Sequence, residues 1–476
     1  MVFTSTIFMF IFLPLVVTLY FLIRKDQRNT LLLIASLLFY AWGEPKHILV
    51  MLASIGINYY FGILIHKYWE NSKKKKNIVI WSVVCNLSLL IFFKYANFIV
   101  DNINSFIGLT GVSKGIDLAT IHLPIGISFF TFQGLSYVID VYRGDVEVQK
   151  SIYDLALYIS FFPQLIAGPI VRYHDIDEQI KERKITIDKV CYGIKRFIMG
   201  FAKKVLIANQ IGLIADKIFA ITPKEISTSL IWIGAICYTL QIYFDFSGYS
   251  DMAIGLGKIF GFDFLENFNY PYISKSIREF WKRWHISLTN WFRDYVYIPL
   301  GGNRKGVARC YVNQIIVFLL SGLWHGASWN FIFWGAYHGA FLVVERTKVG
   351  GVLKKVPKPF RYVYALLVVT VGWVIFRADT LTNAFAYIKK MFVFKASTNV
   401  YYPALYLDNK VIFILILAIV FSTPILRYIN SFAKGLLKKH ERTYDFISNT
   451  ICILVLIVSL IALAGSTYNP FIYFRF

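Results

Sequence analysis

His325 is the residue of this sequence with the clearest potential for chemistry, because it lies midway along an uncharged segment. No Asp, Glu, Lys or Arg occurs between Arg309 and Glu345. This run of about 35 residues could lie in hydrocarbon, where one straight span needs only about 20. An imidazole at that depth is costly unless it faces a protein interior or a wet cavity, so it is a functional candidate. The alternative is a hydrogen bond that joins two membrane helices.

Two glycines flank His325 and predict a break in this segment. At 1.5 Å per residue the run would extend about 52 Å as one helix, whereas the hydrocarbon core is about 30 Å thick, so the chain must bend or re-enter. Gly322 and Gly326 permit close backbone approach or interrupt a helix. We therefore place the irregularity there and expect a pocket or tunnel wall at His325, with His285 lining the same void.

Base catalysis is the simplest chemistry for His325. Ser321 stands one helical turn earlier and could be a nucleophile that the imidazole activates, but no orienting carboxylate is evident nearby in the sequence. Histidine has the side chain whose pKa suits proton transfer near neutral pH. We therefore favour His325 acting directly as a general base.

A second histidine, His285, lies in the segment from Ser274 to Pro299. If this segment forms one helix, His285 lies on an aromatic and apolar stripe of that helix. The stripe comprises Trp281, Trp284, His285, Leu288, Phe292 and Tyr295. A lone histidine on such a face is more often a satisfied core residue than a catalyst, so His285 ranks second to His325.

Three carboxylates lie in or beside apolar runs. Asp245 and Asp251 follow the uncharged run from Ile226 to Phe244, and could pair with a histidine, cap a helix or bind a cation. The spacing distinguishes none of these roles. Asp140 ends another apolar run, and we expect it to pair with Arg143 or another basic group.

The sequence gives no support for a metal site or a disulfide framework. It contains neither HxxxH nor HExxH, and His325 and His338 would lie on roughly opposite faces of a continuous helix. The five cysteines are scattered, without a CxxC pair. We expect no metal.

The composition places these residues in a polytopic membrane protein. Of 476 residues, 57% are hydrophobic, 18% are aromatic and only 16% are charged. The formal net charge is +23. In a membrane protein, basic cytoplasmic loops and anionic lipid headgroups explain this excess, so we expect no nucleic acid.

The apolar segments predict an all-α integral membrane protein with about 10–12 transmembrane spans. Some runs contain helix breakers, namely Pro124, Pro163 and Gly168–Pro169, and broken helices survive in a membrane only where they line a cavity or pack on protein. No internal repeat is visible. We therefore expect a single domain over residues 1–476, without a soluble appendage.

The N-terminal segments predict an orientation. The run from Phe3 to Ile23 lacks a basic start and a small-residue cleavage site, so we expect a retained span and not a signal peptide. Basic clusters near Lys25 and at Lys73–Lys76 should both face the cytoplasm. The N-terminus would then be extracytoplasmic.

Residues 181–220 show the pattern of an amphipathic helix. Basic residues, among them Arg196, Lys203 and Lys204, interleave with apolar ones that recur every three to four positions. We interpret this as a helix lying in the headgroup plane, with its basic residues toward anionic lipid or an anionic ligand.

The block QIYFDFSGYSDMAIGLGKIFGFDFLENFNYPYISKSIREFWKRWHISLTNWFRDYVYIPLGGNRKG, followed by SGLWHGASWNFIFWGAYHG, resembles the membrane-bound O-acyltransferase (MBOAT) family. It is most similar to the family's bacterial alginate O-acetylation branch. The resemblance covers nearly the whole chain. It implies that His325 is the family's W-H-G histidine and that His285 is the histidine of its R-W-H-I-S-L motif.

The resemblance also implies a fold and an activity. Family members wrap many helices, some irregular or re-entrant, around a central tunnel, and the catalytic core would span about residues 120–345. His325 would serve as the base, and Asn330, the Trp324 indole and His285 are candidate oxyanion donors. Trp281 and Trp284 would line the site, together with Asp245 and Asp251.

The implied reaction passes acetyl from a cytoplasmic thioester to hydroxyls of an extracytoplasmic polysaccharide. The donor would be acetyl-CoA or a carrier thioester, with no bound cofactor. We expect a bacterial plasma (inner) membrane protein that contacts lipid and works with an extracytoplasmic acetyltransferase. A sister branch exports D-alanine to teichoic acids, which is one alternative. A polymer or lipid transporter with His325 and Asp245 as relay or gate residues is another.

Overall fold

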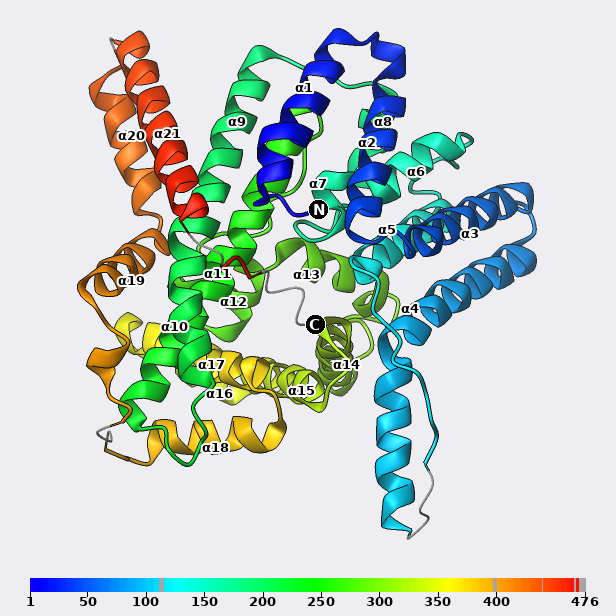
Figure 1. Cartoon of the computed structure of the whole chain (residues 1–476). Coiled ribbons are helices and arrows are strands. Elements are labelled where there is room, and N and C mark those ends of the chain that lie inside the picture. The colour runs from blue at the N-terminus through cyan, green and yellow to red at the C-terminus, as the bar shows by residue number, and fades with distance from the viewer. Residues whose placement is uncertain (111–114, 397–399, 439, 466–467, 471–476) are drawn as a thin grey trace. The chain divides into compact units, whose positions relative to one another are not determined.

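The computed structural model describes residues 1–110, 115–396, 400–438, 440–465 and 468–470, and every regular element in these ranges is a helix (Figure 1). The described chain forms two compact units. Unit 1 comprises residues 1–193, 256–265 and 326–328, and unit 2 comprises residues 194–255, 266–325 and 329–476. The all-α fold predicted from the sequence is confirmed.

Seven helices of the described chain are long and apolar enough to cross a membrane, or eight if one bent pair is counted as a span. They are α3 (Ile48–Lys67), α4 (Ser72–Leu109), the continuous helix Ile187–Phe219, α11 (Thr228–Ile259), α14 (Val307–His325), α17 (Lys358–Arg377) and α21 (Glu441–Ala464). The bent pair is α19 (Asn409–Phe421) with α20 (Ile425–Leu436). The number is lower than the 10–12 expected because several apolar segments form shorter helices, such as Phe8–Leu22.

Unit 1 is built around a helical hairpin and the shorter helices that follow it. Its elements are η1 (Phe8–Phe12), α1 (Leu13–Leu22), η2 (Lys25–Gln27), α2 (Arg28–Gly43), α3, α4, α5 (Ile127–Arg143), α6 (Ile152–Ser160), α7 (Phe162–Leu165) and α8 (Tyr173–Lys181). Asn58 of α3 and Asn86 of α4 exchange two amide hydrogen bonds of 3.0 Å. Both side chains are buried, so this reciprocal pair joins the hairpin without leaving a polar group unsatisfied.

The helix breakers of unit 1 lie where the sequence predicted irregular chain. Pro163 stands in the first turn of α7, directly after the end of α6. Gly126 precedes α5 with a left-handed φ of 78°, and Gly168 follows α7 with a φ of 106°. Such values suit glycine, which has no Cβ to clash with the backbone.

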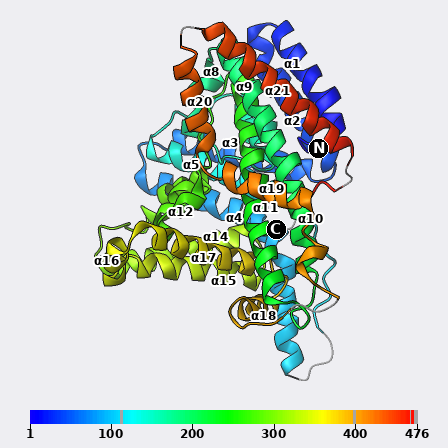
Figure 2. The same cartoon turned by 90° about the vertical axis from the view of Figure 1, so that its left-hand side faces the viewer.

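Unit 2 begins within the continuous helix Ile187–Phe219 and contains most of the long helices. Its elements are α9 (Ile187–Ala202, from residue 194), η3 (Lys203–Ala208), α10 (Asn209–Phe219), α11 to residue 255, η4 (Pro271–Ile273), α12 (Ile277–Arg283), α13 (Ile286–Phe292), η5 (Arg293–Tyr297), α14, α15 (Trp329–Val344), α16 (Lys348–Lys355), α17, α18 (Leu381–Phe392), η6 (Pro403–Leu405), α19, α20 and α21. Figures 1 and 2 show α15 and α17 side by side.

Helices α14 and α15 form a closely packed hairpin because glycines stand at their contact. A Cβ on Gly322 would lie 2.1 Å from the backbone oxygen of Phe331, and one on Gly335 would lie 2.3 Å from that of Phe318. Backbone atoms cannot move aside as a side chain can, so only glycine fits at either position. The predicted role of Gly322 in close backbone approach is confirmed.

The aromatic stripe was predicted for a single helix over the segment from Ser274 to Pro299, but this segment is not one continuous helix. Helix α12 ends at Arg283 and α13 begins at Ile286. The stripe residues are nevertheless all buried. The predicted buried face is therefore right, although α12, α13, the break between them and η5 build it.

The interpretation of residues 181–220 as a helix lying in the headgroup plane is wrong for its central basic residues. Lys204 is buried, and its ammonium lies 2.8 Å from the Asp245 carboxylate. Arg196 and Lys203 lie 2.7 and 2.6 Å from Asp251. These cations face carboxylates of α11 because a charge in apolar surroundings needs an opposite charge nearby.

Candidate active site

His325 is the last residue of α14, and α15 begins at Trp329. The uncharged segment is therefore two helices joined by a short connection at residues 326–328. The predicted break is found at Gly326, whereas Gly322 lies within α14. His325 is therefore held by the backbone of α14 and is directly followed by irregular chain.

Aromatic rings surround the His325 imidazole in unit 2. Its ring centroid lies 4.9 Å from that of Trp324, 5.2 Å from that of Trp334 and 5.2 Å from that of Phe376. These rings come from α14, α15 and α17. Histidine 325 itself is half-buried, whereas Trp334 is fully buried. These apolar rings limit the access of water to the imidazole.

The structure brings His285 to the same aromatic cluster. The Trp324 ring lies 5.9 Å from His285 and 4.9 Å from His325, so one indole contacts both imidazoles. On its other side His285 meets Phe246 of α11, with centroids 4.6 Å apart. The two predicted histidines thus lie in one aromatic cluster, although 40 residues of sequence separate them.

His285 is held in an unusual conformation. Its φ of 44° and ψ of 55° lie in the left-handed region, which costs a residue other than glycine on the order of 1–3 kcal/mol. Burial lowers the pKa of His285 well below its ordinary value, and the nearby His325 lowers it further. His285 is therefore neutral near pH 7.

A residue that the sequence analysis missed, Asn267, binds His285. Its side-chain oxygen lies 3.1 Å from His285 Nδ1. The other missed neighbours of the site are Trp334, nine residues after His325, and Phe376, which comes from the more distant helix α17. Asn267 lies in a loop without hydrophobic periodicity, so no local signal distinguished it from the other asparagines.

Of the three predicted tryptophans, Trp281 and Trp284 belong to the aromatic wall beside the histidines, and Trp324 contacts both imidazoles. Trp281 of α12 lies 5.5 Å from Trp334, which in turn contacts His325. Trp284 lies 4.8 Å from Trp373 of α17. Both are buried, so they shape the site mainly by packing.

Asn330 stands in the first turn of α15, and its side-chain amide donates to the backbone oxygen of Ala378. Ala378 caps the C-terminal end of α17. This bond ties the start of α15, just after His325, to the helix that supplies Phe376.

Asp245 and Asp251 form buried or nearly buried ion pairs. Asp245 pairs with Lys204, and both side chains are less than 5% exposed. Asp251 is shared by Arg196 and Lys203. The sequence left open pairing with a histidine, helix capping or cation binding for these two aspartates. The structure shows ion pairs, but their partners are lysine and arginine and not histidine.

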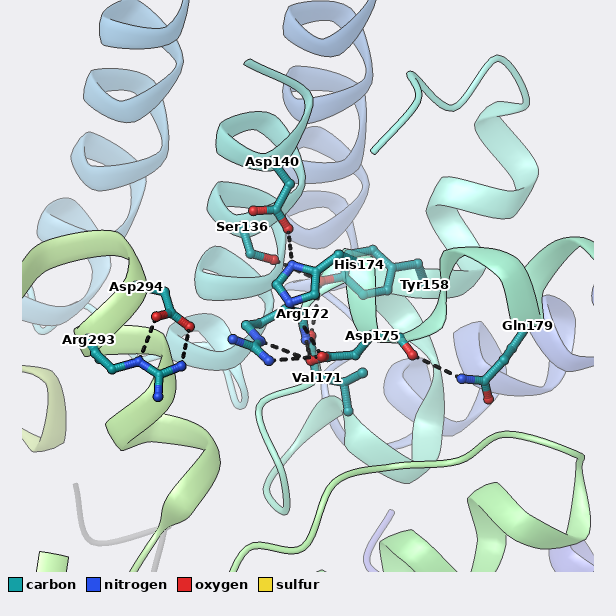
Figure 3. A network of polar contacts seen from close by, with 10 residues as sticks. All are labelled: Ser136, Asp140, Tyr158, Val171, Arg172, His174, Asp175, Gln179, Arg293 and Asp294. Atoms are coloured by element: carbon teal, nitrogen blue, oxygen red, sulfur yellow. Dashed lines mark hydrogen bonds and ion pairs between the residues drawn. The ribbon is translucent and has the colours of Figure 1, made fainter. Parts of the chain in front are cut away.

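Unit 1 contains a separate histidine–carboxylate pair that the sequence analysis did not identify. Asp140 of α5 lies 2.8 Å from Nδ1 of His174 on α8, and Figure 3 shows its carboxylate directed at that ring. The hydrogen bond to Asp140 raises the pKa of His174. Neighbouring Arg172 binds Asp175 through two nitrogens, at 3.0 and 2.9 Å. The expectation that Asp140 pairs with a basic group is confirmed, with His174 as partner.

Within the described ranges, no three His, Cys, Asp or Glu side chains come together in a way that could hold a metal ion. Two imidazoles in aromatic surroundings are suited to accepting, holding and returning a proton.

The chain is similar to known proteins over its whole length. Residues 146–386 match the sequence profile of the membrane-bound O-acyltransferase family, MBOAT. This region contains both histidines and most of the rings around them.

Curated relatives extend the similarity beyond that region. "Probable alginate O-acetylase AlgI" of Azotobacter vinelandii is 48% identical over 394 residues, which cover 83% of this chain and 78% of the relative. The protein of the same name from Pseudomonas putida is 41% identical over the full length of both chains. "Peptidoglycan O-acetyltransferase" of Helicobacter pylori is 34% identical over 100% of this chain and 98% of the relative.

Proposed function

The chain belongs to the membrane-bound O-acyltransferase family, and on that premise we propose that it moves acetyl groups from a cytoplasmic thioester toward hydroxyls of an extracytoplasmic polysaccharide. It is a multi-pass membrane O-acyltransferase. The names of its relatives, which specify O-acetylation of alginate or peptidoglycan, support acetyl as the group and a polysaccharide as the acceptor.

The observation that carries the proposal is the position of His325 at a helix break inside an aromatic cluster. In the proposed step the acceptor hydroxyl attacks the thioester carbonyl carbon while its proton moves to His325. The carbonyl then re-forms, the C–S bond breaks, and the thiolate leaves and takes the proton back from the imidazolium. The products are an O-acetyl ester and a free thiol, and the histidine returns to its neutral form.

The donor is acetyl-CoA or a carrier thioester. An extracytoplasmic acetyltransferase then passes the acetyl group on to the polymer. With such a partner, the hydroxyl that accepts acetyl at His325 belongs to the acetyltransferase or to a carrier. The water-poor surroundings of the ring support the proposal, because they would slow hydrolysis of the thioester.

We place the protein in a bacterial inner membrane with its N-terminus outside. The basic residues near Lys25 and Lys75 support this orientation, since such clusters stay in the cytoplasm. Cysteines introduced beside each should resist an impermeant thiol reagent added to intact cells and react after permeabilisation. Labelling of either one from outside would reverse the orientation.

The direct test of function is transfer of radiolabel. Membrane vesicles that contain the protein receive [¹⁴C]acetyl-CoA or an acetylated carrier, together with a polysaccharide acceptor and the periplasmic fraction. We expect His325→Ala to insert normally and to lose about 10²- to 10⁴-fold in rate. His66→Ala, at an exposed histidine near the end of α3, is the matched control and should transfer normally.

Near-normal transfer by His325→Ala would refute the proposed base. Movement of polymer or lipid by the wild-type protein without any thioester would instead favour a transporter.

A further inference from the structure

Four fully buried polar side chains form a cluster around His285. They are Ser250, Asn267, His285 and Ser287, each no more than 2% exposed. Ser250 belongs to α11, Asn267 to the loop that follows it, and His285 and Ser287 to the start of α13. A polar group buried among aromatic rings is costly unless it is hydrogen-bonded, so the arrangement of these bonds is constrained.

Asn267 is the centre of this cluster. Its Oδ1 accepts from the Ser287 backbone N–H at 3.3 Å and from the Ser287 hydroxyl at 2.9 Å, in addition to its contact with His285 Nδ1 at 3.1 Å. Its Nδ2 donates to the Ser250 hydroxyl at 3.1 Å. The amide oxygen therefore faces donors and the amide nitrogen faces an acceptor, which fixes the orientation of the amide.

This orientation determines the tautomer of His285. An amide oxygen can only accept, so the nitrogen that faces it, Nδ1, carries the proton. In a neutral imidazole the lone pair is then on Nε2. Isolated histidine favours the opposite tautomer, with the proton on Nε2, so the protein must impose this arrangement.

The same loop holds the backbone of His285. The backbone oxygen of Asn267 accepts from the N–H of Ile286 at 2.9 Å, and the N–H of Asn269 donates to the oxygen of Arg283 at 2.9 Å. These two bonds enclose the break between α12 and α13. They help to explain how His285 keeps its left-handed backbone.

Ion pairs anchor the loop in turn. Glu266, next to Asn267, binds the guanidinium of Arg196, and Arg196 also binds Asp251. Asp251 is held by Lys203 as well. Asp251, which the sequence predicted as a site residue, is therefore linked through Arg196 and Glu266 to the loop that contains Asn267.

We propose that Asn267 is a positioning residue for acyl transfer, which fixes the ring orientation and the Nδ1–H tautomer of His285 so that Nε2 accepts hydrogen bonds and protons at the site. The inference rests on the proposed function. It adds a residue that works through His285 without contacting the substrate itself. A merely structural asparagine would satisfy buried groups without setting the tautomer.

The first test needs no activity. In the purified full-length protein with ¹⁵N-labelled histidine, the signals of His285 are assigned by difference from His285→Gln. We expect Nδ1 to be protonated in the wild type and Nε2 to be protonated in Asn267→Ala. A wild-type ring protonated on Nε2 overturns the proposal, whatever the enzyme transfers.

The second test uses the rate of acetyl transfer per folded protein. For Asn267→Ala we expect kcat to fall about 10- to 100-fold, with KM for the thioester within about twofold of the wild type. The matched control is Asn449→Ala, which removes an exposed asparagine side chain of α21 that lies outside this cluster. It should lose less than about threefold.

A conservative variant separates positioning from folding. In Asn267→Asp the carboxylate still accepts from Nδ1, but its charge raises the pKa of His285, so the acidic limb of the pH–rate profile should move to higher pH. Besides Asn267 and Ser287, the rings of Phe246 from α11, Phe268 from the loop and Trp324 from α14 lie against this ring, and His325 is a titratable neighbour.

The outcomes are distinct. An unshifted pH profile in Asn267→Asp, or loss in Asn267→Ala only in proportion to folded protein, returns Asn267 to a structural role. If the wild type transfers no acyl group, the proposed function fails, and the tautomer measurement still decides the role of Asn267. Should Asn267→Ala not fold, Asn267→Asp and the wild-type spectrum decide it.

Discussion

Substituting Gly322 by alanine tests whether the α14–α15 hairpin positions His325. The added methyl would lie 2.1 Å from the backbone oxygen of Phe331 and 3.0 Å from its carbonyl carbon. An ordinary C···O contact is about 3.3 Å or more. The two helices must therefore separate locally by roughly 1 Å, because the obstacle is backbone and has no rotamer to change.

The size of the effect follows from that displacement. Overpacking of this kind costs about 1–3 kcal/mol of stability, which a large helical protein tolerates. His325 lies three residues after Gly322, in the last turn of α14. Misplacement of a reacting group by about 1 Å costs on the order of 10²-fold in rate. We therefore expect Gly322→Ala to insert and fold, and to transfer acetyl about 100-fold more slowly.

The assay is radiolabel transfer per folded protein, with thermal unfolding in detergent to measure stability. Two glycines supply matched controls. A Cβ on Gly351 of α16 meets no heavy atom within 4 Å, so Gly351→Ala should match the wild type. A Cβ on Gly339 meets the flexible end of Ile315 at 3.1 Å, so Gly339→Ala should have a small effect.

The refuting result is a wild-type rate in Gly322→Ala. It would mean that the hairpin opens without moving His325, and the argument that close helix packing places this ring would fail. Equal losses in Gly322→Ala and Gly351→Ala would refute it as well, since the second glycine has open space around it.

Three further predictions concern the other histidines and the buried ion pair. His285→Ala should lower turnover, though less than His325→Ala, and wild-type turnover would leave His285 with a packing role only. Lys204→Met should destabilise the protein by about 3–5 kcal/mol, because it leaves the Asp245 carboxylate buried without its lysine; adding Asp245→Asn should recover part of this loss in thermal unfolding. Asp140 raises the pKa of His174 above its ordinary value of about 6.5, so the pair stabilises fully below that pH and loses this effect as pH rises through the raised pKa. The Tm difference between wild type and Asp140→Asn should thus be larger near pH 6 than near pH 9, and the opposite trend would contradict it.

Local signals were enough to identify the membrane class and the helix break at His325. The uncharged run exceeds what one span needs, and a segment that is too long for the membrane must bend. Glycines mark the cheapest place for that bend. These inferences need only neighbouring residues, which is why the end of α14 at His325 agrees with the sequence.

The break at His285 was invisible from periodicity because the aromatic stripe continues across it. All stripe residues are buried, as a single helix would require. The left-handed residue His285 lies between backbone bonds that Asn267 and Asn269, in a loop upstream, make to Ile286 and Arg283. A pattern of apolar residues reports which side chains are buried and says nothing of bonds made by a distant loop.

Tertiary structure likewise decided which charged side chains form ion pairs with each other. The sequence by itself determined that residues 181–220 interleave basic residues with apolar ones at a helical spacing, and that Asp245 and Asp251 follow an apolar run. Periodicity shows which residues share a face, but it cannot show what lies opposite that face. Folding brings Lys204 within 2.8 Å of Asp245, and it must do so because an isolated charge in apolar surroundings would cost more than the chain can compensate.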